Sequence, residues 1–373
     1  MVYEKELLIA QLAVQRAAIA SKLILKDYSK LYASKTITKE DHSPVTIADF
    51  AVQSIIISSI TQFFPNDKFM AEESSDDLET RKDLVSLILK YCKQTDIEFR
   101  QRNLHQFQFE PIVEGSQIIE SLNKGGYEGG KDARFWVLDP IDGTKGFLRN
   151  DQFALCLSLM VSNKIRVGIN GCPNLPVNIK KIIETHDFGK SNFNLNDYLK
   201  QNPSTAKGLL FTAMENKGSY VQELFEDIKA PFDSQTERIF MNNNLPSIKE
   251  NVIVEGVETK HSDHESQSQI KKLLGISPNR TVNLDSQCKY SLLAYGVANM
   301  YLRLPFSMGY REKIWDHSSG YLLVKESGGV ATDMNGVDLD FTRGRYLESK
   351  GIIAGSKQFH GQFISAVKES VKL

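Results

Sequence analysis

The sequence predicts an α/β protein in which helices are layered on sheets. Apolar residues recur at helical spacing over residues 3–28, and a second apolar helix follows the turn at Ser43-Pro44 and stops at Pro65. Short apolar runs such as RFWVLDP and QFALCLSLMV have the length of buried strands. Helices and strands keep alternating toward the C-terminus, and no glycine-rich dinucleotide-binding loop lies among them.

The N-terminal half places short strands on either side of a long polar segment. We expect one strand in DKFMAEE and a second in RFWVLDP, which ends at Asp139. Two more strands, QFALCLSLMV and KIRVGING, are joined by a turn at Ser162-Asn163. Residues 74–131 are polar and irregular, with one helix over 84–91. We interpret them as a peripheral insertion, either ordinary surface structure or a mobile lid.

The C-terminal half starts with a loop-rich stretch at residues 176–207 and then alternates again. Strands are expected over 209–215, in NVIVEGVE, at the end of YSLLAYGVANMYLRLP and in KGIIAGS. Helices are expected in ESQSQIKKLLG, which Gly275 closes, in YSLLAYG, in WDHSSGYLLVKESGG and in HGQFISAVKES.

Composition limits the kinds of partner. The chain has 373 residues with 45 Lys and Arg against 46 Asp and Glu, a net charge of −1. Such a balance argues against a nucleic-acid polymer or an anionic membrane as partner. An anionic small molecule must therefore be held by metal ions or by a few placed cationic side chains.

Cysteines and hydropathy suggest where the protein works. Cys92, Cys156, Cys172 and Cys288 form no CxxC pair, and their spacing indicates neither a disulfide framework nor a zinc site. The N-terminus is charged and does not resemble a signal peptide. No stretch approaches the roughly 18 apolar residues of a membrane span. We expect a cytoplasmic protein.

Acidic residues in DPIDGT suggest a metal site. A strand delivers Asp139 to its carboxyl end, where ligands bind in open α/β sheets, and Asp142 follows three residues on. A tight turn brings both carboxylates and the Ile141 carbonyl to one point, which suits the hard oxygen ligands of magnesium. Gly143 allows close approach of the backbone, and a helix starting here would offer the amides of Gly143 and Thr144 to a phosphate.

Each acidic element alone also has a plainer interpretation. DPIDGT could be a turn with two solvated aspartates, and Glu72-Glu73 a solvated loop. Asp49 could sit on a helix surface or cap the helix, and Asp316 is most simply an N-cap, a role compatible with metal binding.

Two longer motifs identify a family. WVLDPIDGTKGFLR with IWDHSSG and ESGGVATD resembles the signature motifs of the lithium-sensitive, magnesium-dependent phosphatases, relatives of inositol monophosphatase and fructose-1,6-bisphosphatase. SPVTIADFAVQ, FMAEESS, GCPNLP, YLRLP and EKIWDH extend the likeness from about residue 40 to the end. HSDHE and LDSQCKY resemble the branch of 3'(2'),5'-bisphosphate nucleotidases of the fungal salt-tolerance type.

The resemblance implies a site with two or three magnesium ions. Its implied metal ligands are Glu72, Asp139, the Ile141 carbonyl, Asp142 and Asp316. Asp49 and Glu72 would organise the third, weaker ion, and Asp49 with Thr144 would deprotonate the attacking water. The residues implied in substrate binding are Gly143, Thr144, His261 (rather than His264), Ser286, Lys289, Arg303 and Asp316.

The resemblance also implies a fold, the layered α/β/α/β/α sandwich of the inositol monophosphatase and fructose-1,6-bisphosphatase type. We expect an N-terminal α+β domain over 1–175 with most metal ligands, and a C-terminal α/β domain over 176–373 with Asp316 and the nucleotide-recognition residues. The active site should lie between them.

The implied activity is removal of the 3'-phosphate (or 2'-phosphate) of adenosine 3',5'-bisphosphate to give AMP and phosphate, with the sulfated nucleotide PAPS as a further substrate. Such an enzyme supports sulfate assimilation and methionine synthesis, is inhibited by lithium and sodium, and is expected to be a monomer.

Three alternatives stay open. One is an inositol polyphosphate 1-phosphatase of the same fold, acting for example on inositol 1,4-bisphosphate. Another is a non-catalytic nucleotide or cation sensor that keeps the fold. The last is an enzyme that forms an aspartyl-phosphate on Asp139.

Overall fold

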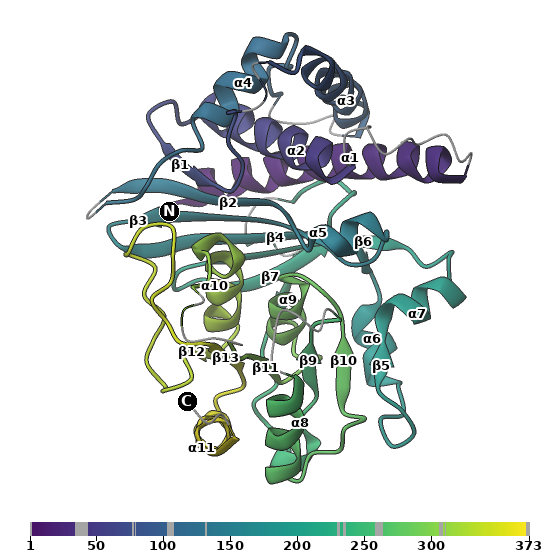
Figure 1. The fold of residues 1–373 in the computed structure, drawn as a ribbon, viewed down its shortest axis with the longest axis vertical. Coiled ribbons are helices and arrows are strands. Elements are labelled where there is room, and N and C mark those ends of the chain that lie inside the picture. Colours follow the sequence, from purple (N-terminus) through teal and green to yellow (C-terminus); the bar gives the residue numbers. More distant parts are fainter. Residues whose placement is uncertain are drawn as a thin grey trace.

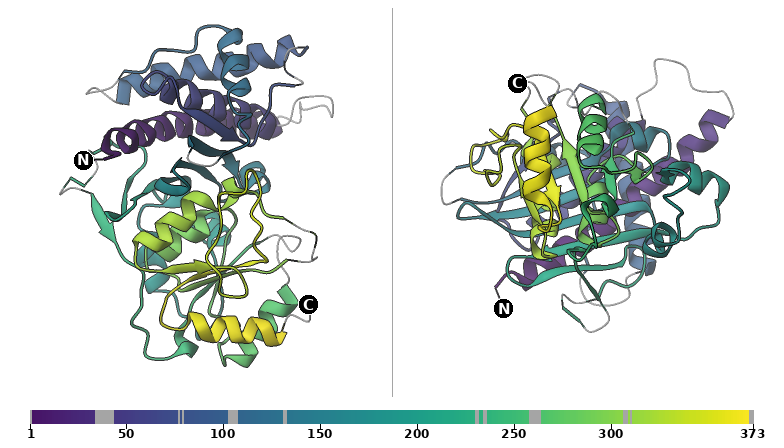
Figure 2. Two further views of the ribbon diagram at one scale, coloured as in Figure 1. Left: turned by 90° about the vertical axis from the view of Figure 1, so that its left-hand side faces the viewer. Right: turned by 90° about the horizontal axis from the view of Figure 1, so that it is seen from below.

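Two sheets and three helical layers stack in the computed structural model, as Figures 1 and 2 show from three sides. The structure describes residues 2–33, 44–76, 78, 80–102, 108–130, 133–229, 232–233, 236–257, 264–305, 309 and 311–370.

The first sheet has seven strands in the order β1-β2-β3-β4-β6-β7-β8. Their bounds are Lys68–Ala71, Arg134–Asp142, Ala154–Val161, Lys164–Pro176, Lys207–Met214, Gly218–Glu223 and Glu237–Ile239. Strands β1 and β2 are parallel and the other neighbours are antiparallel. The predicted turn between β3 and β4 is confirmed, because Ser162 and Asn163 adopt positive φ angles of 50° and 65°.

Helices α1 (Glu4–Ala33) and α2 (Pro44–Thr61) cover one face of this sheet. Helices α3 (Lys82–Arg102) and α4 (Gly115–Asn123) pack on them from outside, so the described part of residues 74–131 contains two packed helices where we expected one. The buried Arg16 guanidinium ties α1 to α3 by donating from Nε to Asp96 Oδ1 at 2.8 Å.

The second sheet has six strands in the order β12-β13-β11-β9-β10-β5. Their bounds are Val330–Thr332, Ile352–Gly355, Met300–Arg303, Ile253–Glu255, Thr281–Asn283 and Phe193–Asn194. Helices α9 (Cys288–Ala294) and α10 (Ser318–Glu326) lie between the sheets. Helices α8 (His264–Leu273) and α11 (His360–Ser370) form the outer layer. The predicted α/β/α/β/α sandwich is confirmed.

Three apolar cores fill the spaces between the layers. One cluster joins α1 and α2 to the first sheet, a second joins the two sheets through α9 and α10, and a third joins the second sheet to α8 and α11. Because burial of apolar area is the main favourable term in folding, these three cores fix how the layers stack.

The stretch predicted to be loop-rich, residues 176–207, is in fact structured. It contains α6 (Ile179–Glu184), β5 and α7 (Leu195–Gln201). Helix α6 buries Ile179, Ile182 and Ile183 at helical spacing. The Asn194 side chain caps α7 by accepting from the amides of Asn196 and Asp197. The spacing of the isoleucines and the capping residue Asn194 are both visible in the sequence, but each marks a helix of only one or two turns.

The predicted boundary at residues 175 and 176 falls at the end of β4. The chain then contributes β5 to the second sheet, but β6, β7 and β8 return to the first sheet. The two sheets are therefore not divided by a single point in the chain, and the two-domain division stays a prediction.

Helix α1 corrects one expectation about membranes. Residues 4–28 are long and apolar enough, by length and composition, to cross a bilayer. In the structure 83% of their most apolar window is buried inside the protein, against the first sheet and its neighbouring helices. The buried core of a folded protein accounts for this composition equally well.

Candidate active site

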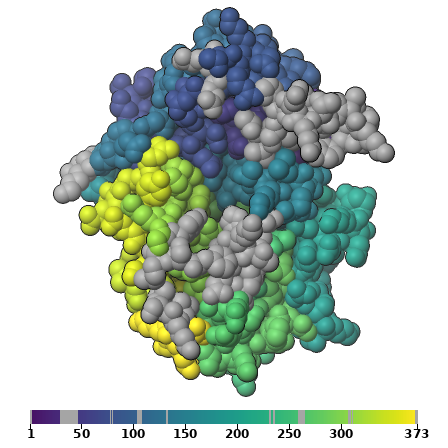
Figure 3. Space-filling model, viewed as in Figure 1, coloured from purple at the N-terminus to yellow at the C-terminus, as the bar shows by residue number. Residues whose placement is uncertain are grey.

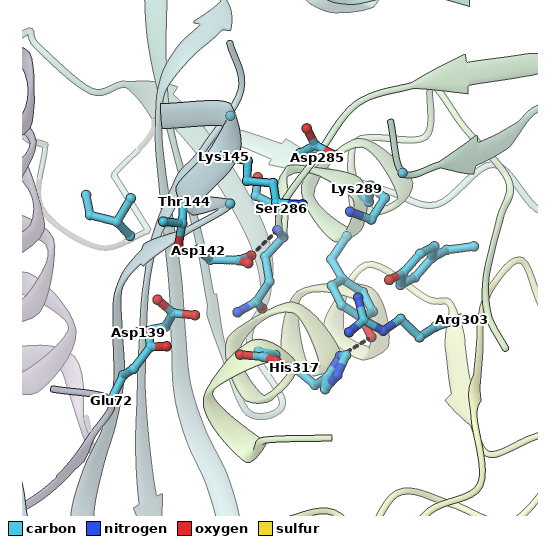
Figure 4. A pocket seen from close by; sticks show the side chains of 18 of the residues that line it. Glu72, Asp139, Asp142, Thr144, Lys145, Asp285, Ser286, Lys289, Arg303 and His317 are labelled. Atoms are coloured by element: carbon cyan, nitrogen blue, oxygen red, sulfur yellow. Dashed lines mark hydrogen bonds between the residues drawn. The ribbon is translucent and has the colours of Figure 1, made fainter. Parts of the chain in front are cut away.

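A cavity of about 360 Å³ opens between the first sheet and the layer formed by α9 and α10. Figure 4 shows its two walls: Glu72, Asp139 and Asp142 lie on one side, and Lys289, Arg303 and His317 on the other. The wall residues come from β2, β11, the start of α9, the segment after β1 and the segment before α10. We call these the acidic wall and the basic wall. Asp316 also lines the cavity; it comes from the segment of His317, and we count it with the acidic wall because of its charge.

The DPIDGT segment extends β2 by three residues beyond the predicted end at Asp139. The register with β3 shifts between Asp139 and Asp142, so Pro140 and Ile141 together oppose Leu155. Such a bulge re-aims side chains next to active sites. The Ile141 side chain is buried in the core, which leaves its main chain to line the cavity beside the two aspartates.

Parallel pairing of β1 with β2 brings Glu72 to the same end of the strands as Asp139. Ala71 lies opposite Leu138, and the Glu72 amide donates to the Leu138 carbonyl at 3.2 Å. Glu72 thus follows β1 where Asp139 lies in β2, and the charge of Glu72 raises the pKa of Asp139 in addition to the effect of burial. The side chain of Glu72 reaches solvent at the mouth of the cavity, whereas Asp139 is buried.

Asp316 reaches the cavity from the other half of the chain. It ends the short 3-10 helix Ile314–Asp316 just before α10. The residue at the N-cap of α10 is His317, and no side chain caps that helix. The interpretation of Asp316 as an N-cap is therefore wrong, and its carboxyl group is left to face the cavity.

Burial dominates the electrostatics of the acidic wall. It raises the pKa of Asp139 well above its ordinary value, and the charges of Glu72, Asp142 and Asp316 raise it further. Burial also raises the pKa of Asp316 and of Asp142, although Lys289 and the Gln287 amide partly offset the rise at Asp142. Burial therefore opposes the charged form of each of these three carboxyl groups, and a bound cation would favour it.

The donor set fits a divalent cation such as magnesium. Asp139 Oδ1 is buried without a hydrogen-bond partner, which costs free energy unless a cation or donor approaches it. Five acidic residues and Ile141 line the same cavity; Asp285 is paired with Arg149, which leaves four carboxyl groups as possible ligands. Magnesium takes oxygen ligands of this kind. The residues that could hold such ions are Glu72, Asp139, Ile141, Asp142 and Asp316.

A tighter cluster of acidic and imidazole groups lies deeper. Among the described residues, the ligand atoms of Glu312, Asp316 and His317 lie within 4.8 Å of one another. Glu312, however, accepts two hydrogen bonds from Arg303 and lies 3.3 Å from His317 Nε2. Since Glu312 is already neutralised there, we favour the more widely spaced acids of the acidic wall as metal ligands.

A short helix begins where the sequence suggested. Helix α5 (Thr144–Leu148) starts with Gly143 as its N-cap at φ 91°, a left-handed conformation that favours glycine. Gly143 and the exposed Thr144 both line the cavity. Their amides are therefore available to an anion bound next to Asp142.

Asp49 lies behind the acidic wall rather than in it. Its buried carboxyl group has a pKa raised first by burial and then by the charges of Glu73 and Glu72. No hydrogen bond joins Asp49 to Thr144 within the part of the chain that the structure describes. The catalytic roles of both residues stay predictions.

On the basic wall, Lys289 is buried and its Nζ lies 5.4 Å from the centre of the Tyr301 ring. Arg303 donates from Nε and Nη2 to the two carboxylate oxygens of Glu312, at 2.8 and 3.0 Å. Ser286 also lines the cavity and has a φ of 67°, which is uncommon for serine. His261 lies outside the described residues, so its predicted role stays untouched.

Sequence reasoning missed the partners of Arg303. Burial alone favours a raised pKa for Glu312, but His317 and Arg303 outweigh it and hold the pKa at about 2. Burial lowers the pKa of His317, so the imidazole is neutral near pH 7. His317 Nε2–H then donates to Glu312, and Nδ1 accepts from the Tyr290 hydroxyl at 2.9 Å. The sequence did offer a signal, because Glu312 lies only four residues before Asp316 in the segment EKIWDH.

Comparisons with known proteins agree with this site. The model of the inositol monophosphatase family matches residues 6–372. The chain is 41% identical over 375 residues to 3'(2'),5'-bisphosphate nucleotidase 1 of Candida albicans, covering 98% of this chain and 96% of that one. It is 39% identical to the 3'(2'),5'-bisphosphate nucleotidase of Emericella nidulans, with both chains covered completely.

Solved structures agree on the fold. An inositol monophosphatase from Zymomonas mobilis superposes with a TM-score of 0.57 over 99% of each chain at 16% identity. An inositol monophosphatase from Thermotoga maritima gives 0.53 at 18% identity, covering 96% of this chain and 95% of that one.

Proposed function

The chain belongs to the inositol monophosphatase family, and from that membership we propose that it is a magnesium-dependent phosphatase of a bisphosphorylated nucleotide. It removes the 3'-phosphate, or the 2'-phosphate of the isomer, from adenosine 3',5'-bisphosphate and releases AMP and phosphate. Support comes from relatives at 37–41% identity over nearly the full length, which carry the name 3'(2'),5'-bisphosphate nucleotidase.

One observation carries the proposal: an acidic wall and a basic wall face each other across one cavity. A substrate with two phosphates needs cations at both ends. Metal ions on the acidic wall would hold the scissile phosphate, and Lys289 would hold the second phosphate with a charge-assisted hydrogen bond. A substrate with one phosphate would leave Lys289 without an ionic partner.

Magnesium, when bound by Glu72, Asp139, Ile141, Asp142 and Asp316, supplies charge neutralisation and lowers the pKa of water. The chain itself supplies orientation and proton transfer. Thr144 and the Gly143 amide orient the phosphate at the start of α5. Asp49, whose pKa is raised by burial, takes the proton of the attacking water through Thr144.

The nucleoside lies along the basic wall. Ser286 and Lys289, both before or at the start of α9, contact the ribose and second phosphate, and Arg303 adds charge beside Tyr301. His261 contributes from the segment after Val257. The aromatic ring of Tyr301 and the apolar Leu302 offer surface against which a base can pack.

We further propose a biological setting. The enzyme also hydrolyses PAPS, supports sulfate assimilation and methionine synthesis, and is inhibited by lithium and sodium at a magnesium position. A cytoplasmic monomer is consistent with four cysteines that are all free and buried.

The test is phosphate release with magnesium from a panel of substrates. The panel contains adenosine 3',5'-bisphosphate, its 2',5' isomer, PAPS, inositol 1-phosphate and inositol 1,4-bisphosphate, each with and without lithium. We expect the nucleotides to give the highest kcat/KM and lithium to inhibit. Equal or better turnover of the inositol phosphates would overturn the nucleotide assignment.

The same assay distinguishes a phosphatase from a sensor and from an aspartyl-phosphate enzyme. A sensor would bind nucleotide without releasing phosphate. An aspartyl-phosphate enzyme would trap labelled phosphate on Asp139 after acid quenching, whereas direct hydrolysis leaves the protein unlabelled.

A further inference from the structure

Asp142 and Asp316 come from different halves of the chain, and one buried side chain links their segments. Gln287 is the N-cap residue of α9 and is 2% exposed. It lines the cavity between the acidic and the basic wall. It is not one of the residues predicted to bind metal or substrate.

The main chain of Gln287 holds the first ligand. Its amide donates to Asp142 Oδ2, so one carboxylate oxygen is fixed and the other is free to face the cavity. Its carbonyl accepts from Asn170 Nδ2 on β4 at 3.3 Å, which anchors the segment to the first sheet.

The side chain of Gln287 holds the segment of the second ligand. Nε2 donates to the carbonyl of Trp315, the residue before Asp316, at 2.8 Å. Oε1 accepts from the Gly320 amide at 3.0 Å, in the first turn of α10. One amide group thus binds the chain on both sides of Asp316.

A second contact closes the network. Ser319 Oγ lies 2.6 Å from Asn170 Oδ1 and 3.0 Å from Gln287 Oε1. A hydroxyl has one proton, so the shorter contact to Asn170 takes it, and the Gly320 amide remains the main donor to Gln287. Since both ends of the Gln287 amide have partners, its orientation is determined and it cannot flip without losing two bonds.

We propose that Gln287 is a positioning residue that sets the distance between Asp142 and Asp316, and thereby the affinity of the site for divalent cations. The inference rests on the proposed function, because it takes these two acids as metal ligands. Groups behind the ligands are known to change metal affinity by about 10- to 100-fold when removed. A purely structural glutamine would affect folding stability and leave metal affinity unchanged.

The test compares Gln287→Met with a matched variant far from the cavity. Methionine keeps the length of the side chain and removes both hydrogen bonds, to Trp315 and to Gly320. Gln15 on α1 is the control, because it is fully buried and its Nε2 donates to the carbonyls of Leu224 and Glu226 at 2.9 and 2.6 Å. Gln15→Met removes a comparable buried amide outside the active site.

The readout is Mn²⁺ binding to the full-length protein, by titration calorimetry and by the EPR signal of free Mn²⁺, with thermal unfolding alongside. We expect Gln287→Met to weaken Mn²⁺ binding by about 10- to 100-fold and Gln15→Met to leave it unchanged, while both lower the melting temperature. Magnesium at high concentration should restore much of the turnover of Gln287→Met. If Gln287→Met does not fold, Gln287→Asn, which keeps an uncharged amide but shortens the side chain by one methylene, is measured in its place.

Two outcomes overturn the inference in different ways. Wild-type affinity for Mn²⁺ in the Gln287 variant, or equal losses in both variants, overturns the positioning role and leaves the proposed function standing. A wild-type protein that binds no Mn²⁺ overturns the metal site itself, and the inference with it.

Discussion

The two walls of the cavity treat buried charge in opposite ways. On the basic wall, Glu312 is neutralised by Arg303 and hydrogen-bonded to His317, so its pKa falls to about 2. On the acidic wall, burial raises the pKa of Asp139 and of Asp316, and neither forms an ion pair among the described residues. The comparison teaches that the cluster of Glu312, Arg303 and His317 is balanced by its own partners, whereas Asp139 and Asp316 need a cation from outside the protein to balance their charge.

The largest effect should come from neutralising the acidic wall. We expect Asp139→Asn to lower kcat by roughly a thousandfold or more, because a metal contributes several kcal/mol to transition-state stabilisation. The same change should raise the melting temperature in EDTA. The folded pKa of Asp139 lies above its ordinary value of 3.8, so the ionised form destabilises the fold at pH 7.

Phosphate release and thermal unfolding in EDTA check both parts. Asp227→Asn, which changes an exposed acid paired with Lys229, is the control. A lower melting temperature for Asp139→Asn in EDTA would contradict the view that the acidic wall is destabilised by its own charge.

The next largest effect is expected on the basic wall. There the charge of Glu312 stabilises the fold, so stability falls as the pH is lowered, opposite to the effect of Asp139 in EDTA. Glu312 has a folded pKa of about 2 against an ordinary 4.5, a difference worth roughly 3 kcal/mol at about 1.36 kcal/mol per pKa unit. The stabilisation is present above pH 4.5 and is lost as the pH falls toward 2. Glu312→Gln should therefore lower the free energy of unfolding at pH 7 by about that amount.

Urea unfolding between pH 3 and pH 7, with EDTA present, measures this difference. The gap between wild type and Glu312→Gln should narrow as the pH falls below 4.5. A gap that stays constant with pH would show that packing, and not the charge of Glu312, carries the effect.

Lys289 should give a moderate effect that depends on the substrate. It forms no ion pair within the described chain and its Nζ is near Tyr301, so a second phosphate is its expected partner. We expect Lys289→Met to raise KM for adenosine 3',5'-bisphosphate by about 10- to 100-fold, the worth of a hydrogen bond between charged groups.

Turnover of a sugar monophosphate should change little in Lys289→Met. Steady-state kinetics on both substrates separate KM from kcat, and Lys200→Met, at a side chain that is 70% exposed, is the control. Equal losses on both substrates would place Lys289 with the scissile phosphate instead.

The smallest effect is expected at a contact that bridges the two halves of the chain. Arg345 donates from Nη2 to the Ala71 carbonyl, next to Glu72, at 2.7 Å, and its guanidinium lies 4.6 Å from the centre of the Trp315 ring. In the space-filling view of Figure 3, the yellow C-terminal part of the chain lies against the blue N-terminal part on the left of the molecule. Arg345→Met should raise the magnesium concentration for half-maximal activity by about five- to tenfold.

Arg343→Met is the matched control, because Arg343 lies in the same loop and pairs only with Asp340 among the described residues. Magnesium titrations of phosphate release make the measurement. If the Arg345 variant requires no more magnesium than the Arg343 variant, Arg345 does not affect the metal site, and Gln287 remains as the residue that links the two halves of the site.

Much of the fold follows from patterns within short windows. The apolar periodicity of residues 3–28 and the apolar runs around Asp139 predicted α1, β2 and β3, because those residues are buried on one face or on both. The DPIDGT pattern placed Asp139 and Asp142 at one site, and the family resemblance added Asp316; all three line one cavity.

The rest depends on contacts between distant residues. The pairing of Arg303 with Glu312 and the hydrogen bond from Gln287 to Trp315 need β11, α9 and α10 to be packed first. Helix α6 has only one buried turn, too short for periodicity to separate it from a loop. The start of α10 was misjudged because an acid before a helix usually caps it, while here the main chain places His317 at that position.

The excursion through β5 has a consequence for folding kinetics. Phe193 and Asn194 of β5 pair with β10, nearly ninety positions later in the chain. After β5 the chain returns to the first sheet and completes it with β6, β7 and β8. Neither sheet can be completed from one continuous stretch of the chain. Both sheets therefore require large loops to close, at a cost in chain entropy, before the strand contacts form that offset this cost. We expect the protein to unfold in a single cooperative transition, and a fragment ending at residue 175 to lack the strands it needs to fold.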